Sequence, residues 1–160
     1  MRKQDFDKIN EHKNIKIKDD TDVIYKIESL LNEQDYAVLC SQGDSQVYSS
    51  LVGFSIDENL KNIVFATPNY TRKYQLLSQC QKISMLIDNR SHKINRVSEI
   101  EAITIVGEAM DITNIEQKKI HKKQLLDKHP YLLELVSSDS CSIFNVKIKK
   151  YFYVTRIQEV

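Results

Sequence analysis

The residues with the clearest potential for chemistry lie in segment 65–74, which reads Phe-Ala-Thr-Pro-Asn-Tyr-Thr-Arg-Lys-Tyr. It leads from a predicted strand into the start of a predicted helix, where free backbone N–H groups and the helix dipole favour an anion. Arg72 and Lys73 are each disfavoured there by about 0.3–1 kcal/mol when nothing negative is bound. A phosphate would reverse the sign of that cost, because it accepts hydrogen bonds from the Thr67 and Thr71 hydroxyls and a bidentate pair from Arg72. The alternative is that Arg72 and Lys73 are ordinary exposed residues of a short helix.

The remaining sequence suggests neither a metal site nor a nucleophile. It has no C-x-x-C pair, and its histidines lack i, i+4 spacing and metal-type carboxylate motifs. A Ser or Cys nucleophile with an ordered His and acid is also missing. We therefore expect no metal ion and no hydrolysis through a covalent intermediate. A haem site would need an axial histidine, for which His92 and His121 are the candidates in a set of four: His12, His92, His121 and His129.

The cysteines and the N-terminus indicate a cytoplasmic protein. Cys40, Cys80 and Cys141 are odd in number and widely spaced, so they cannot form a complete set of disulfides within one chain. Cys40 lies in an apolar run and is expected to be a small core residue. The N-terminus lacks the apolar run of a signal peptide, and no stretch of about 20 apolar residues would span a membrane.

The net charge of the chain gives no reason to expect that it binds a polyanion such as nucleic acid. The chain has 160 residues, 41% of them hydrophobic, and a formal net charge of +1. This length suits one domain with one core. The alternating Lys147 and Lys149, with Lys150, are interpreted as the solvated side of the last strand rather than as a nucleic-acid surface.

The pattern of apolar residues and turn residues predicts the elements that position these groups. Helices are expected over 21–34, over 71–79, and from a Thr113–Glu116 capping box to about Lys128, with a further helical turn or two over 131–136. Strands are expected in a hairpin over 36–56 and over 62–66, 82–87, 101–110 and 141–157.

Successive strands joined by short turns predict an antiparallel sheet, and six strands can close on themselves to remove exposed edges. The fold class expected is therefore mainly β: a six-stranded antiparallel barrel with peripheral helices. Residues 1–20 mix charges of both signs with few apolar side chains, so we expect a polar N-terminal arm at 1–20 and a single domain over 21–160.

Four segments resemble the pyridoxamine 5′-phosphate oxidase-like family of split barrels, which bind flavin mononucleotide (FMN). The segments are Ala-Val-Leu at 37–39, Ser-Ser-Leu-Val-Gly-Phe at 49–54, Phe-Ala-Thr with Thr-Arg-Lys at 65–67 and 71–73, and Ile-Ser-Met-Leu-Ile-Asp-Asn-Arg at 83–90. The resemblance covers about 24–110 and, more weakly, the tail to 160. It implies an FMN-binding split barrel that forms a homodimer with the cofactor at the subunit interface.

The resemblance also implies the roles of individual residues. Segment 49–54 corresponds to the strand that lines the flavin, with the backbone of Ser50, Leu51 and Val52 at the ring system. Ala66 and Thr67 correspond to the ribityl-phosphate end, and Thr71, Arg72 and Lys73 to the phosphate clamp. The full set of cofactor-binding residues expected is Ser49, Ser50, Leu51, Val52, Ala66, Thr67, Thr71, Arg72 and Lys73.

Two departures from the family bear on its activity. Ala102 stands where the vitamin-forming oxidases carry a glutamine, and the C-terminus has Arg156 without their R-L-x-x-R motif. We therefore expect FMN binding without vitamin B6 oxidase activity. The function expected is an oxidoreductase or electron-transfer flavoprotein, with a nicotinamide cofactor as electron donor and no general acid or base identified. The alternative is a non-catalytic module that binds flavin, haem or a deazaflavin on the same barrel.

Overall fold

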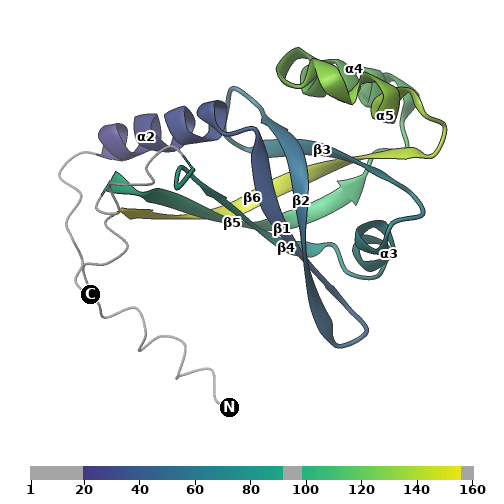
Figure 1. Ribbon diagram of the computed structural model, residues 1–160, viewed down its shortest axis with the longest axis horizontal. Helices are drawn as coiled ribbons and strands as arrows, with labels where there is room; N and C mark the ends of the chain where they lie inside the picture. The colour runs from purple at the N-terminus through teal and green to yellow at the C-terminus, as the bar shows by residue number, and fades with distance from the viewer. Residues whose placement is uncertain (1–19, 92–98, 156–160) are drawn as a thin grey trace.

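The computed structural model describes residues 20–91 and 99–155 of the chain (Figure 1). The sequence predictions for most of the N-terminal arm, for His12 and His92, and for Arg156 lie outside these residues. The helices are α2 (Asp20–Glu33), α3 (Arg72–Gln79), α4 (Ile115–Lys128), the 3₁₀ helix η3 (Pro130–Leu132) and α5 (Leu133–Ser137). The strands are β1 (Tyr36–Gly43), β2 (Gln46–Ile56), β3 (Asn62–Pro68), β4 (Lys82–Asp88), β5 (Glu101–Asp111) and β6 (Cys141–Thr155).

The six strands form one closed antiparallel barrel in the order β1-β2-β3-β6-β5-β4. The predicted fold class is confirmed. In Figure 1, α2 and the α4–α5 pair lie above the barrel at its two ends, and α3 lies below α4. Closure pairs the last strand, β6, with both β3 and β5, so that none of the six is left as an edge strand along its whole length.

The predicted elements agree with those observed, apart from one helix cap. The expected capping box placed Thr113 at the N-cap of α4, but Asn114 is the N-cap, and its Oδ1 accepts from the backbone N–H of Gln117 at 3.0 Å. The helix therefore begins at Ile115. Asparagine is at least as good an N-cap as threonine, because its short side chain reaches the same free donors.

Two apolar clusters hold the domain together. The larger one fills the barrel with alternate residues of all six strands and is covered by α2 through Leu30 and Leu31 and by α3 through Leu77. The smaller one joins α4 and α5 to the outer faces of β3 and β6, with Leu125 and Val136 in contact with strand residues such as Val64. None of the described helices has the length and apolar character needed to span a membrane.

The expectation that Cys40 is a core residue is wrong. Along β1 the buried residues are Ala37, Leu39 and Ser41, whereas Cys40 is only half-buried. Side chains alternate between the two faces of a strand, so Cys40 lies on the outer face of the barrel. Its Sγ lies 3.4 Å from the hydroxyl of Ser49 on β2.

Candidate functional site

The barrel is split between β2 and β3. β2 pairs with β1 over its residues 46–53, but its pairing with β3 is restricted to the three residues that follow, Phe54, Ser55 and Ile56. Residues 46–53 of β2 therefore present an edge without a strand partner toward β3, whose own C-terminal residues pair only with β6. The chain leaves β3 at Pro68 and enters α3 beside this opening.

All nine residues expected to bind the cofactor border this split. Four lie on the unpartnered part of β2, two at the end of β3, and three at the start of α3, in that order: Ser49, Ser50, Leu51, Val52; Ala66, Thr67; Thr71, Arg72, Lys73. A hydrogen bond across the opening, from Lys73 Nζ to the carbonyl oxygen of Leu51 at 3.1 Å, ties α3 to β2. Three segments that are separate in the sequence are thus adjacent in the fold.

The two threonines hold the start of α3 in place. Thr71 is its N-cap: the hydroxyl accepts from the backbone N–H of Tyr74 at 3.3 Å and donates to the carbonyl of Pro68 at 2.9 Å. Thr67 is 1% exposed, and its hydroxyl lies 3.0 Å from that of Thr71. Because these hydroxyls already bond within the turn, their first role is to fix the position of Arg72 and Lys73.

Arg72 is exposed and only weakly engaged. Its Nη2 lies 3.5 Å from Oε1 of Gln46, and its guanidinium carbon lies 5.6 Å from the centre of the Tyr48 ring. The first turn of α3 contains no acidic residue. Most of the five N–H donors of the guanidinium are therefore left for a ligand that carries negative charge.

Lys73 is the more buried of the two cations. Burial lowers the pKa of its ammonium group from the ordinary value. Over residues 20–91 and 99–155, neither Arg72 nor Lys73 forms an ion pair with a carboxylate. A partly desolvated ammonium without a counter-ion is costly, and an anion bound beside it would lower that cost.

The β2 side of the split carries polar groups that a ligand could use. The hydroxyl of Ser50 is buried and has no hydrogen-bond partner among the described residues. The carbonyl of Leu51 points into the split, and in an antiparallel strand the N–H of the same residue points the same way. Polar atoms of this kind fit the edge of a ligand that offers both donors and acceptors, as the flavin ring system does.

A buried histidine next to this strand escaped the sequence predictions. His129 is fully buried, and its Nε2 lies 2.7 Å from the carbonyl oxygen of Phe54. Phe54 follows the residue of β2 that pairs with the first residue of β1. The Nδ1 of His129 lies 3.0 Å from the hydroxyl of Tyr131. The sequence signal is weak: a histidine at a helix end, followed by Pro130 and a tyrosine.

A hollow of about 250 Å³ lies on the outer face of the barrel, at the other side of β2 from the split. Its floor is apolar, with Val38, Leu51 and Leu86 contributed by three adjacent strands. Its rim is polar and is formed by the residues Glu33, Gln34, Asp35, Tyr36, Asp88, Arg90 and Ser91.

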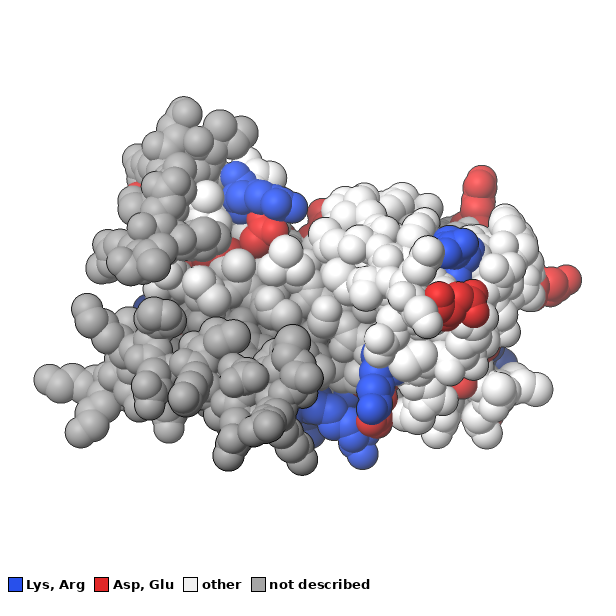
Figure 2. Space-filling view, turned by 90° about the horizontal axis from the view of Figure 1, so that it is seen from below, with Lys and Arg blue, Asp and Glu red and all other residues white. Residues whose placement is uncertain are grey.

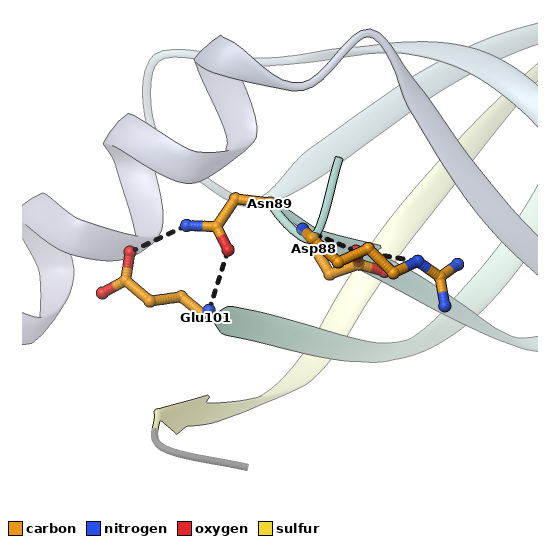
Figure 3. A network of polar contacts seen from close by, with 4 residues as sticks. Asp88, Asn89 and Glu101 are labelled. Atoms are coloured by element: carbon orange, nitrogen blue, oxygen red, sulfur yellow. Dashed lines mark hydrogen bonds and ion pairs between the residues drawn. The ribbon is translucent and has the colours of Figure 1, made fainter. Parts of the chain in front are cut away.

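One side of this rim is fixed by hydrogen bonds (Figure 3). The side chain of Asn89 accepts from the backbone N–H of Glu101 at 2.9 Å, which joins the end of β4 to the start of β5. Arg90 pairs with Asp88, with Nε and Oδ1 3.1 Å apart. Asp88 is thereby neutralised and held at the margin of the hollow.

On the outer face of the barrel, four apolar side chains and one threonine lie in register across five strands and form the apolar band; Leu51 and Phe152 at its two ends are exposed, and the three residues between them are half-buried. The Cα register runs from Leu51 through Val38, Leu86 and Thr104 to Phe152, across β2, β1, β4, β5 and β6. Leu51 is 61% exposed and Phe152 is 43% exposed. Figure 2 shows one face of the molecule, on which uncharged side chains, polar and apolar alike, cover most of the described surface.

The chain matches no family model and no curated protein sequence. Solved structures do match it. HutZ, the haem storage protein from Vibrio cholerae, has a TM-score of 0.70 at 10% identity, over 82% of this chain and 93% of HutZ. A FAD-binding protein from Mesorhizobium loti, mll6688, has a TM-score of 0.64 at 13% identity, over 81% of this chain and 91% of its own.

A heme-binding protein from Mycobacterium smegmatis has a TM-score of 0.71 at 12% identity. The match covers 81% of this chain but 52% of that protein, so this chain spans about half of its length. At these identities the similarity shows a common fold. It is the split barrel implied by the sequence resemblance.

Proposed function

We propose that this protein is an FMN-binding flavoprotein that works as an oxidoreductase or electron-transfer protein, with the cofactor held in the split between β2 and β3. The observation that carries the proposal is the pair of cations at the start of α3, Arg72 and Lys73, which have no carboxylate partner among the described residues. The buried hydroxyl of Ser50 on the facing strand, which has no partner in the part of the chain that the structure describes, supports it. Similarity of fold to a FAD-binding protein supports it further.

In this proposal each side of the split has its own task. Arg72 and Lys73 would hold the phosphate, while Thr67 and Thr71 keep the helix start in position through their mutual hydrogen bond. Ala66 would border the ribityl chain, and the backbone of Ser49 to Val52 would face the ring system. When bound, FMN supplies one- and two-electron redox chemistry, which needs no acid or base from the protein. A nicotinamide cofactor is the electron donor we expect.

The apolar band, which is exposed at Leu51 and Phe152, supports a homodimer as the working form. Exposed, contiguous apolar surface on a soluble domain marks an interaction site. A two-fold dimer would cover the band with the same band of a second copy, and it would bring the partner close to β2. The double variant Leu51→Glu, Phe152→Glu should therefore sediment as a monomer where the unmodified protein sediments as a dimer. A monomeric unmodified protein would contradict this part of the proposal.

The absorbance spectrum of the protein, purified without added cofactor, tests the main proposal. Flavin absorption in the blue, and its bleaching when reduced nicotinamide nucleotide is added without oxygen, is the expected result. A flavin spectrum that does not bleach would favour a non-catalytic binding module. A protein that takes up no FMN, even when the nucleotide is added in excess, would refute the proposal.

A haem-binding module is the second candidate, because two proteins of similar fold are described as binding or storing haem. In the part of the chain that the structure describes, the histidines are His121 and His129. Both ring nitrogens of His129 are engaged, and Nδ1 of His121 lies 3.2 Å from Gln124. His121 thus keeps one nitrogen for a haem iron, and a Soret band lost in His121→Ala would identify this module. A deazaflavin would be recognised by its own absorption spectrum.

A further inference from the structure

The β1–β2 hairpin extends beyond the strands that flank it. β1 pairs with β4 no further than Cys40, and β2 pairs with β3 only from Phe54 onward. Residues 41–48, which form the hairpin arm, therefore pair only with one another within the described part of the chain. Asp44 and Ser45 both have positive φ angles, 50° and 61°, as the two-residue turn that best matches the twist of a hairpin requires. The arm thus projects from the barrel with a fixed register (Figure 1).

One face of the hairpin arm lies against α3. The helix approaches Gly43 so closely that a Cβ atom added there would lie 2.7 Å from Cδ2 of Leu76. Gln46 is the residue paired with Gly43, and paired residues share a face of the sheet. Tyr48 stands two residues after Gln46, so its side chain points to the same face. Gln46 and Tyr48 are therefore directed toward α3, whose first residue is Arg72.

Gln46 and Tyr48 both contact the side chain of Arg72. Oε1 of Gln46 accepts from Nη2 of Arg72 at 3.5 Å, and the centre of the Tyr48 ring lies 5.6 Å from the guanidinium carbon. An aromatic ring attracts a cation through the negative charge of its face. Neither the amide nor the ring carries a net charge, and Asp44, the only acidic residue of the arm, forms no ion pair with Arg72 among the described residues. The arm thus restricts the guanidinium without neutralising it.

A cation held in this way is suited to bind a phosphate. An arginine that is free in solvent loses rotamer freedom when it binds a ligand, and each side chain immobilised on binding lowers the affinity by about two- to tenfold. Contacts that restrict the side chain beforehand remove part of that loss. We infer that Tyr48 and Gln46 are positioning residues of the phosphate site, which hold Arg72 ready for a phosphate group. The identity of that group as the phosphate of FMN rests on the proposed function.

The affinities for FMN and for riboflavin, which lacks the phosphate, test the role of Tyr48. We expect Tyr48→Leu to weaken FMN binding by about two- to tenfold and to leave riboflavin binding unchanged. Tyr48→Phe keeps the ring and should bind FMN as the unmodified protein does. Tyr25→Leu, which removes an exposed tyrosine from α2, is the matched control and should also bind FMN normally. An unchanged FMN affinity in Tyr48→Leu would overturn the inference.

The same substitution in the Arg72→Ala background shows whether Tyr48 acts through Arg72. Without the guanidinium, Tyr48→Leu should cause no further loss of FMN affinity, because the two residues would be energetically coupled. A loss of equal size with and without the guanidinium would mean that Tyr48 contacts FMN itself or shapes the strand. That result would also overturn the inference.

Gln46→Glu tests why the group beside Arg72 must be neutral. The new carboxylate would pair with Arg72 and repel the phosphate, so FMN binding should weaken by about tenfold or more. The loss should be smaller at high salt, because salt screens charges that are exposed to solvent. FMN binding by Gln46→Glu that is as tight as that of the unmodified protein would contradict the role given to Gln46.

A measurement without flavin separates this inference from the proposed function. The Nε–H signal of Arg72 in ¹⁵N-labelled, ligand-free protein is followed by NMR while inorganic phosphate is added. Tyr48→Leu should move this signal, because the ring no longer lies beside the guanidinium, and should weaken phosphate binding, whereas Tyr25→Leu should do neither. If the unmodified protein binds no FMN, the proposed function fails and the phosphate titration alone decides the inference. An Arg72 signal or a phosphate affinity that Tyr48→Leu leaves unchanged would overturn it.

Discussion

Removing the guanidinium of Arg72 is the most direct test of where the phosphate of FMN binds. In the structure, the guanidinium makes one long contact of 3.5 Å with Gln46 and lies over the ring of Tyr48. An exposed contact with an aromatic ring is worth about 0.5–1 kcal/mol, so the Arg72→Ala variant should remain folded and lose no more than this in unfolding free energy. Its effect on the ligand should be much larger.

The size of that effect follows from the charge of the lost contact. A hydrogen bond to a charged group is worth about 1.5–3 kcal/mol, which corresponds to a loss of FMN affinity of about 10- to 150-fold. Riboflavin lacks the phosphate, so its affinity should be nearly the same in the variant and in the unmodified protein. The ratio of the two affinities therefore isolates the phosphate contact from any general damage to the site.

Quenching of flavin fluorescence during titration measures both affinities. Lys119→Ala, which removes an exposed cation from α4 on a different part of the surface, is the control for net charge. The reasoning is wrong if Arg72→Ala binds FMN as tightly as the unmodified protein. It is equally wrong if FMN and riboflavin weaken by the same factor.

Three further predictions concern stability. Burial lowers the pKa of Lys128 to about 8, while in the unfolded chain this pKa keeps a value of about 10.4, so the unfolded chain binds the proton more tightly. The free energy of unfolding should therefore rise between about pH 8 and 10, relative to that of the Lys128→Met variant. Urea titrations at each pH would measure this rise. Replacing His129 by Phe leaves the carbonyl of Phe54 without its donor and should cost about 1–3 kcal/mol in the same assay at pH 7; a neutral substitution would mean that this bond is not what holds η3 to the barrel. In Gly107→Ala, the new Cβ would lie 2.7 Å from the backbone oxygen of Lys147 at the bulge between β5 and β6, so a loss of about 1–3 kcal/mol is expected, and an unchanged melting temperature would contradict it.

The order of elements and most of their bounds could be predicted from local patterns alone. The alternation in β5, with Ile103 and Ile105 buried and Val106 exposed, can be predicted from the sequence, because successive side chains of a strand point to opposite faces of the sheet. The cap of α4 was misplaced by one residue because Thr113 and Asn114 are both good caps, and only the backbone path selects between them. The orientation of Cys40 was missed for a similar reason, since an apolar run does not show which of its residues face inward.

The sequence by itself determined the barrel and the position of a cationic helix start, because both depend on periodicity and on residues that are neighbours in the chain. Tertiary structure decided what those residues face. Among the described residues, the unpartnered edge of β2 and the isolation of Arg72 and Lys73 from carboxylates depend on segments many positions apart. Such contacts are set by how the strands register and close, and that information is distributed over the whole chain.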